Sequence, residues 1–166
     1  MQLGSLKKRF IMELQDVYSA ENQLTEGLQK MADAASNQEL KQAFQQHLQE
    51  TQGQIQRLEQ VFSQLGEQPG NETCEAMQGL IKEAEELLSM QADPDVLDAA
   101  LIACAQKNEH YEIASYGTLV TYANMMDETD VADLLQATLD EEYATDDKLT
   151  AFAESTVNIR AQKGGS

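Results

Sequence analysis

The sequence has no tryptophan, and its five tyrosines and four phenylalanines make up only 5% of 166 residues. A core with so few aromatic residues must be built mainly from Leu, Ala, Met and Ile. Cysteine is also scarce, since the chain contains only Cys74 and Cys104. Two cysteines supply neither a disulfide framework nor a cysteine-based zinc site, so we expect two reduced thiols. The chain lacks a run of about 18 apolar residues, which argues against a membrane-spanning helix.

Basic residues are few, with 11 Lys and Arg against 29 Asp and Glu, and the formal net charge is −18. A surface of this charge repels polyanions, which argues against nucleic acid or an anionic membrane as a partner. It does not argue against cations. The first residues do not form an apolar leader with a small-residue cleavage site, and this favours a cytoplasmic protein.

Proline and glycine are clustered in breaks between long helical patterns. One break is at 66–71, and a second is at 92–95, where Pro94 follows Asp93 as in the first turn of a helix. Elsewhere the apolar residues recur with a period near 3.6, which predicts an all-α chain. The predicted helices span about 3–33, 37–65, 73–91, 95–125 and 129–158. We expect one domain over 1–163, followed by a flexible tail over 164–166.

The lengths of the connections predict how these helices are arranged. Four of the helices have about 30 residues each, or about 45 Å of helix. Short connections near 34–36 and 126–128 predict two antiparallel hairpins. A connection of about 28 residues, with a helix of its own, joins the hairpins, and this is typical of a ferritin-like four-helix bundle.

Acidic and polar residues interrupt the apolar stripe of each long helix near its middle. They are Glu21 in the first helix, His47, Glu50, Thr51 and Gln54 in the second, Glu109 and Glu112 in the third, and Glu142 and Asp146 in the fourth. Any one carboxylate at the edge of a stripe can simply face water. However, 29 residues separate Glu21 from Glu50, and 30 separate Glu112 from Glu142. In two similar hairpins, these spacings predict a single central layer of carboxylates.

Several carboxylates in a bundle centre of low dielectric constant need a neutralising partner. Metal cations are the simplest partner. Oxygen-rich ligation with bridging glutamates suits a pair of iron or manganese ions, whereas zinc prefers more nitrogen and sulfur ligands. The sequence therefore predicts two metal ions at mid-bundle.

Several separated strings make the chain similar to a known family. They are ELQDVYSAENQL, KQAFQQHLQETQGQIQRLEQVFSQLGE, CEAMQGLIKEAEE, NEHYEIASYGTL and LLQATLDEEYATDDKL, in the right order over about 5–158. They resemble the YciE/YciF family of bacterial ferritin-like stress proteins. The resemblance implies a ferritin-like bundle with a rubrerythrin-like metal site, a link to stress responses and a homodimer.

The resemblance also implies a set of ligands. In the ferritin-like pattern, Glu21 matches the single glutamate of the first helix. Glu50 matches the glutamate of the second helix, and Glu142 matches the glutamate of the fourth. Glu109 and Glu112 match the Glu-x-x-Glu of a rubrerythrin third helix. His47, one turn before Glu50, and Asp146, one turn after Glu142, are the further candidates. The implied metal ligands are thus Glu21, Glu50, Glu109, Glu112, Glu142, His47 and Asp146.

The chain departs from the di-metal pattern at two positions. Gly53 and Thr145 stand where the Glu-x-x-His pattern of these bundles has histidine, so the site is poor in imidazole. His110 should face away from Glu109 and lie outside the ligand set. Tyr18, Tyr111 and Tyr116 are candidates for hydrogen-bond donors near the site, with ordinary packing as the alternative.

These features support one leading functional hypothesis and two rivals. The leading hypothesis is a di-iron or di-manganese centre that reacts with O₂ or a peroxide in a two-electron step. The first rival is a non-enzymatic dimeric stress protein whose acidic layer holds no stable metal. The second is iron storage in a ferritin-type shell.

Overall fold

The structure, a computed structural model, describes residues 4–164 and is helical over most of that range. Its elements are α1 (Leu6–Ala34), α2 (Gln38–Leu65), α3 (Glu75–Leu88), α4 (Pro94–Met125), α5 (Thr129–Phe152), a π-helical turn (Ala153–Val157) and α6 (Asn158–Gly164). The predicted all-α class is confirmed. The prediction of one continuous helix over about 129–158 is wrong in one respect. The π-helical turn interrupts this helix, and α6 follows the turn.

The expected flexible tail is only partly described. Gly164 ends α6, and residues 165 and 166 lie outside the described residues, as does the expected helix start at residue 3. No helix of the described chain combines the length and the apolar character needed to cross a membrane.

Short polar side chains begin the long helices where the sequence has capping residues. Ser5 accepts a hydrogen bond from the Lys8 amide, and Asn37 accepts from the amides of Glu39 and Leu40. Asp93 caps α4 directly before Pro94. Gly66 ends α2 with a φ of 66°, a left-handed conformation that favours glycine.

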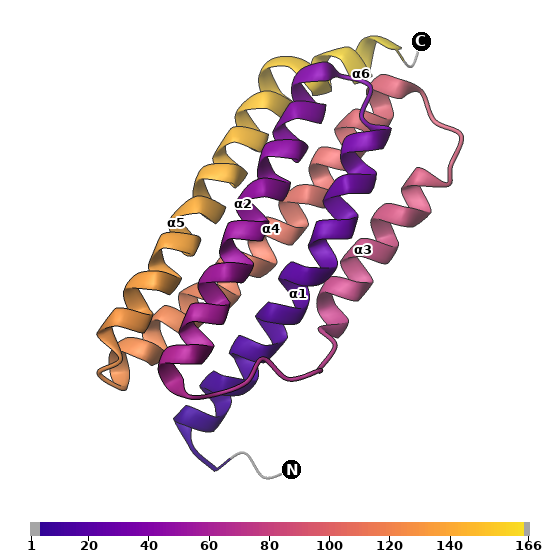
Figure 1. The fold of residues 1–166 in the computed structure, drawn as a ribbon. Helices are drawn as coiled ribbons and strands as arrows, with labels where there is room; N and C mark the ends of the chain where they lie inside the picture. The colour runs from indigo at the N-terminus through magenta and orange to yellow at the C-terminus, as the bar shows by residue number, and fades with distance from the viewer. Residues whose placement is uncertain (1–3, 165–166) are drawn as a thin grey trace.

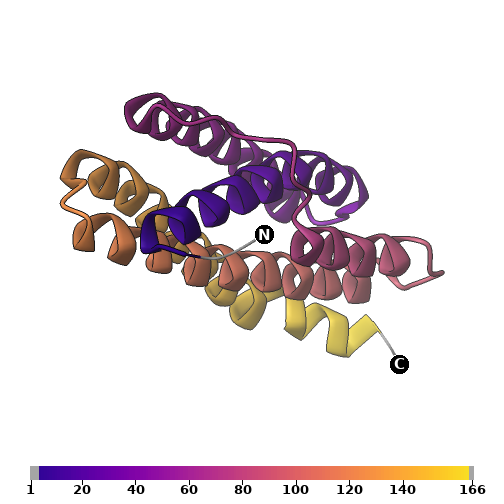
Figure 2. The ribbon, with the colours of Figure 1, turned by 90° about the horizontal axis from the view of Figure 1, so that it is seen from below.

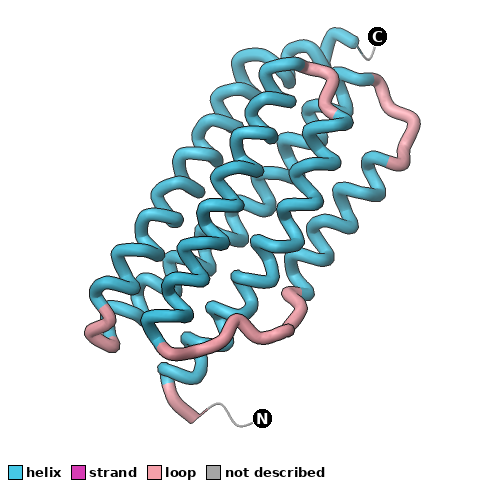
Figure 3. The backbone as a smooth tube through the Cα atoms, viewed as in Figure 1, coloured by secondary structure: helices cyan, strands magenta, loops and turns pink. Residues whose placement is uncertain are grey.

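The four long helices form two antiparallel hairpins, α1 with α2 and α4 with α5 (Figure 1). Seen from below, the hairpins stack as two layers, with α1 against α4 and α2 against α5 (Figure 2). The long crossover places α3 on the outside of α1 and α4, and α6 packs back on α4. Loops lie at the two ends of the bundle, so its middle is helix on all four sides (Figure 3).

A buried carboxylate joins the two hairpins at one end. Asp98 of α4 is 1% exposed and accepts hydrogen bonds from the amides of Ser36 and Asn37, both at 2.8 Å, and from the Ser36 hydroxyl at 2.6 Å. These donors lie in the turn between α1 and α2. Asp98 therefore fixes the first hairpin against the start of α4.

The apolar core is divided into two clusters. One contains Leu24, Leu28, Phe44, Leu101 and Leu149, among others. The second contains Phe10, Leu14, Leu58, Leu119 and Leu135, among others. Between them, near the middle of each long helix, the buried side chains are polar. The predicted interruption of all four apolar stripes is therefore a property of the folded core.

Candidate metal centre

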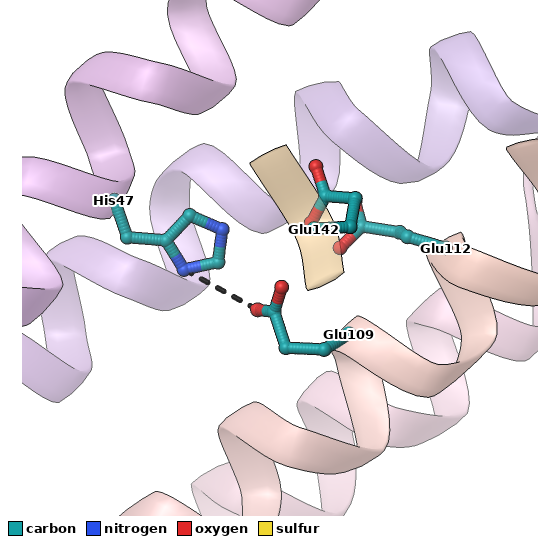
Figure 4. A group of neighbouring side chains, drawn as sticks. All are labelled: His47, Glu109, Glu112 and Glu142. Atoms are coloured by element: carbon teal, nitrogen blue, oxygen red, sulfur yellow. Dashed lines mark ion pairs between the residues drawn. The ribbon is translucent and has the colours of Figure 1, made fainter. Parts of the chain in front are cut away.

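Five buried residues from the four long helices form a layer between the two apolar clusters. They are Glu21 of α1, His47 of α2, Glu109 and Glu112 of α4, and Glu142 of α5, and we call them the acid layer. The four glutamates are 0% exposed and His47 is 4% exposed. The side chains of His47, Glu109, Glu112 and Glu142 point toward one another, and one ligand atom from each lies within 4.8 Å of the others (Figure 4).

Most polar atoms of the acid layer have no hydrogen-bond partner among the described residues. Both carboxyl oxygens of Glu109 and of Glu112 are buried and unpartnered, as is one oxygen each of Glu21 and Glu142. Both nitrogens of His47 are also unpartnered. Because an unsatisfied buried polar atom costs free energy, so many at one place point to a missing partner for this layer.

Burial and mutual repulsion favour the protonated forms of these carboxyl groups when no cation is present. Burial raises the pKa of Glu142 from 4.5 to about 7. Burial, followed by the charge of Glu142, raises the pKa of Glu21 and of Glu109 well above the usual range. Burial, followed by the charges of Glu21 and Glu142, does the same to the pKa of Glu112. A nearby cation would reverse the effect by favouring the ionised forms.

His47 is neutral near pH 7, in the form that binds metals. Burial, followed by the charge of Lys148, lowers the pKa of His47 from 6.5 to about 4. Its Nδ1 lies 3.4 Å from a Glu109 oxygen, a contact that is an ion pair only if the imidazole is protonated. The neutral imidazole therefore faces the carboxyl groups as a free donor of an electron pair.

Neighbouring side chains hold some of the acid layer in position. The Tyr116 hydroxyl, 0% exposed, donates to Glu21 Oε1 at 2.5 Å. Gln54 donates to Glu142 from α2. Arg57, also on α2, forms an ion pair of 2.9 Å with Glu141, the residue next to Glu142. Glu141 also accepts a hydrogen bond from Gln54 at 3.1 Å, so the Gln54 amide donates to both Glu141 and Glu142.

The structure does not bring all the predicted ligands into the acid layer. Glu50 is only partly buried and accepts a hydrogen bond from Gln46 at 2.9 Å on the flank of α2. Asp146 is partly buried and accepts from Gln106 at 3.3 Å. His110 is exposed, as expected, and lies 3.4 Å from Asp146.

The three candidate tyrosines have three different environments. Tyr18 donates to Glu59 at 3.2 Å and packs edge-on against Phe62, and Tyr111 donates to Asp16 on the outside of α4. Only Tyr116, of the three, contacts the acid layer. The spacing gives a signal for it, because Tyr116 follows Glu112 by four residues and so lies on the same helix face.

The residues present are chemically able to hold a metal ion. Four carboxyl groups and one imidazole match iron or manganese better than zinc.

The fold and the acid layer together define a ferritin-like four-helix bundle with a buried carboxylate and histidine cluster. The sequence profile described as a domain of unknown function, DUF892, matches residues 5–162. The chain belongs to this family.

Proteins similar to this chain in sequence or in fold come from several bacteria. YciF of Escherichia coli K12 is 50% identical over 163 residues, which is 98% of each chain. The crystal structure of this E. coli stress protein superposes with a TM-score of 0.91, covering 94% of this chain and 99% of that one. YcfI of Rhodopseudomonas palustris, described as a candidate structural protein, is 45% identical, with a TM-score of 0.87 and coverage of 90% and 95%. A Xanthomonas campestris protein, 24% identical with a TM-score of 0.78, has the same fold.

Proposed function

We propose that the protein binds two iron or manganese ions in the acid layer and reacts with O₂ or a peroxide as part of a stress response. The observation that carries this proposal is the set of buried, unpartnered oxygen and nitrogen atoms in the acid layer. Four ionised glutamates carry −4, and two divalent cations carry +4, so the pair of ions would neutralise the layer. Glu50 and Asp146 lie beside it, where they would approach the ions only by turning inward.

Two such ions would supply the two electrons that reduce hydrogen peroxide, together with two protons, to two waters. The protein's own part is to hold the ligands and to exclude bulk water. Tyr116 fixes Glu21 and Gln54 fixes Glu142, so these two carboxylates are oriented before a metal arrives. The apolar clusters on both sides keep water out of the layer.

Metal content is the test of this proposal. Purified metal-free protein is loaded anaerobically with Fe(II) or Mn(II), desalted, and analysed by elemental analysis. We expect about two ions per wild-type chain, and one or none for Glu142→Gln, which loses a ligand of the layer. Asp140→Asn is the matched control and should keep the wild-type content, because Asp140 is exposed on α5 and accepts a hydrogen bond from Gln136. Wild-type content below about a tenth of an ion per chain would contradict the proposal.

A non-enzymatic role is the second candidate, and specific residues favour it. Gly53 and Thr145 occupy the positions of the two histidines of the di-metal pattern, which weakens the site for metal. If the protein has this non-enzymatic role, Glu142→Ala would not lower the thermal stability, because removing one buried acid relieves the repulsion among the glutamates of the acid layer. We further propose a homodimer in the cytoplasm, and the mass in solution separates a dimer from a ferritin-type shell.

A further inference from the structure

A cavity of about 210 Å³ lies between α2 and α5, with His47 among its lining residues. On the α2 side its residues recur at helical spacing, with Glu39, Ala43, His47 and Glu50 along one face. His47 is the residue that the cavity shares with the acid layer, and its ring is 4% exposed with both nitrogens unpartnered. The cavity therefore ends against one residue of the acid layer.

A short side chain explains part of this space. Thr145 lines the cavity and stands three residues after Glu142, where the Glu-x-x-His pattern of di-metal bundles has a histidine. Threonine is smaller than histidine, so volume that an imidazole would fill beside His47 is left open. The departure that makes the site poor in nitrogen ligands also creates room next to it.

The walls and the mouth of the cavity differ in chemistry. Phe44, Leu149 and Phe152 supply apolar wall, and the first two belong to the buried core cluster on that side. The charged lining residues are Glu39, Glu50 and Lys148, with a net charge of −1 if all are ionised. The acid layer lies beyond His47. Apolar walls with excess negative charge disfavour anions and hydrated ions, and favour a neutral molecule with an apolar body.

We propose that this cavity binds a small neutral organic molecule with one polar end, of the alkyl hydroperoxide class, and directs that end toward His47. A cavity of about 210 Å³ equals about seven water volumes at about 30 Å³ each, so a molecule the size of tert-butyl hydroperoxide fits. The choice of a hydroperoxide rests on the proposed function. The binding of a neutral molecule of this shape does not.

The test uses tert-butyl alcohol, an unreactive analogue of the hydroperoxide, titrated into metal-free protein and followed by NMR. We expect saturable shifts of the Ala43 methyl, the Leu149 methyls and the His47 ring. Ala43 is exposed on α2, so Ala43→Phe fills the cavity without disturbing the core, and it should weaken binding at least about tenfold. Ala137→Phe, at an exposed position of α5 outside the cavity lining, is the matched control and should bind like the wild type.

A charged probe tests the class of ligand. Trimethylacetate has the same tert-butyl body with a carboxylate, and we expect it to bind at least about fivefold more weakly than the alcohol at pH 7. Tighter binding of the anion would overturn the assignment and indicate an anion site at Lys148. Equal binding of the alcohol to Ala43→Phe and to wild type would overturn the location. Neither result depends on metal content, so failure of this inference is distinct from failure of the proposed function.

Discussion

The carboxyl oxygens of the acid layer differ in their hydrogen-bond partners, and Tyr116 is the donor to one of them. Its hydroxyl donates to Glu21 at 2.5 Å, and both groups are 0% exposed. Burial, followed by the charge of Glu21, raises the pKa of Tyr116, so the phenol remains a donor at all relevant pH values. Tyr116 is thus a fixed donor to one carboxylate, whereas Glu109 and Glu112 have no such partner.

We expect Tyr116→Phe to lower the free energy of unfolding of the metal-free protein by about 1–3 kcal/mol, because Glu21 loses its buried donor. Urea denaturation followed by circular dichroism measures this change. Tyr143→Phe removes the hydroxyl of a tyrosine that is 53% exposed, and its effect should stay within about 0.5 kcal/mol. Equal effects of the two variants would show that the Tyr116 hydroxyl does not stabilise the buried carboxyl group.

The phase of each helix explains which ligands could be predicted from the sequence. The buried stripe of α2 runs through His47, Thr51, Gln54 and Leu58, and that of α5 runs through Thr138, Glu142, Thr145 and Leu149. Glu50 and Asp146 are each one residue away from these stripes, on the flank of the helix. Apolar periodicity defines a stripe only to about one residue, so the sequence could not separate Glu50 from Thr51 or Asp146 from Thr145.

Other elements were predictable because their signals are local. Capping residues, proline and a left-handed glycine mark the ends of α1, α2 and α4, and these ends lie within a few residues of the predictions. The π-helical turn at Ala153–Val157 has no such signal in the sequence. It arises where α5 continues into α6 and α6 packs on α4, a tertiary effect that helical periodicity does not report.

The hydrogen bonds of Asp98 between the two hairpins predict a measurable contribution to stability. Asp98→Ala removes three hydrogen bonds that hold the turn between α1 and α2 against α4, and the amides of Ser36 and Asn37 lose their acceptor. We expect the free energy of unfolding to fall by about 2–4 kcal/mol.

The urea midpoint and the slope of the transition measure the effect of Asp98→Ala. Asp133→Ala, at an exposed position of α5, is the control and should change stability by less than about 0.5 kcal/mol. A loss no larger than that of the control would mean that the turn is held by packing rather than by Asp98.

For the whole molecule, the acid layer separates two kinds of acidic residue. Most of the 29 Asp and Glu lie on the surface, where water screens them, but four glutamates of the layer are 0% exposed. The formal charge of −18 therefore counts four glutamates whose ionisation the metal-free fold disfavours, because burial raises the pKa of each. Metal binding would exchange these protons for cations, so stability, metal content and pH are linked.

The direction of this linkage follows from the pKa values. The folded pKa of Glu142 is about 7, above its usual 4.5, so the native state binds more protons than the unfolded chain between these values. The free energy of unfolding of the metal-free protein should therefore fall as pH rises from about 4.5 to about 7. His47 acts in the opposite direction between about 4 and 6.5, because its pKa is lowered. The effect of His47 on the free energy of unfolding opposes that of one carboxyl group. Because the pKa values of Glu21, Glu109 and Glu112 are also raised, we expect the net stability to fall as the pH rises.

Melting temperatures measured from pH 5 to pH 7.5 in the presence of a chelator test this prediction. The melting temperature of the metal-free wild type should fall more steeply with pH than that of Glu142→Gln, because glutamine removes one titrating group. One such group changes the free energy of unfolding by at most about 1.4 kcal/mol per pH unit. Protein loaded with Mn(II) should show the opposite trend, since ligands must lose their protons to bind metal. If the wild type and Glu142→Gln have the same slope without metal, the Glu142 carboxyl group is ionised in the folded protein and the acid layer is hydrated rather than closed.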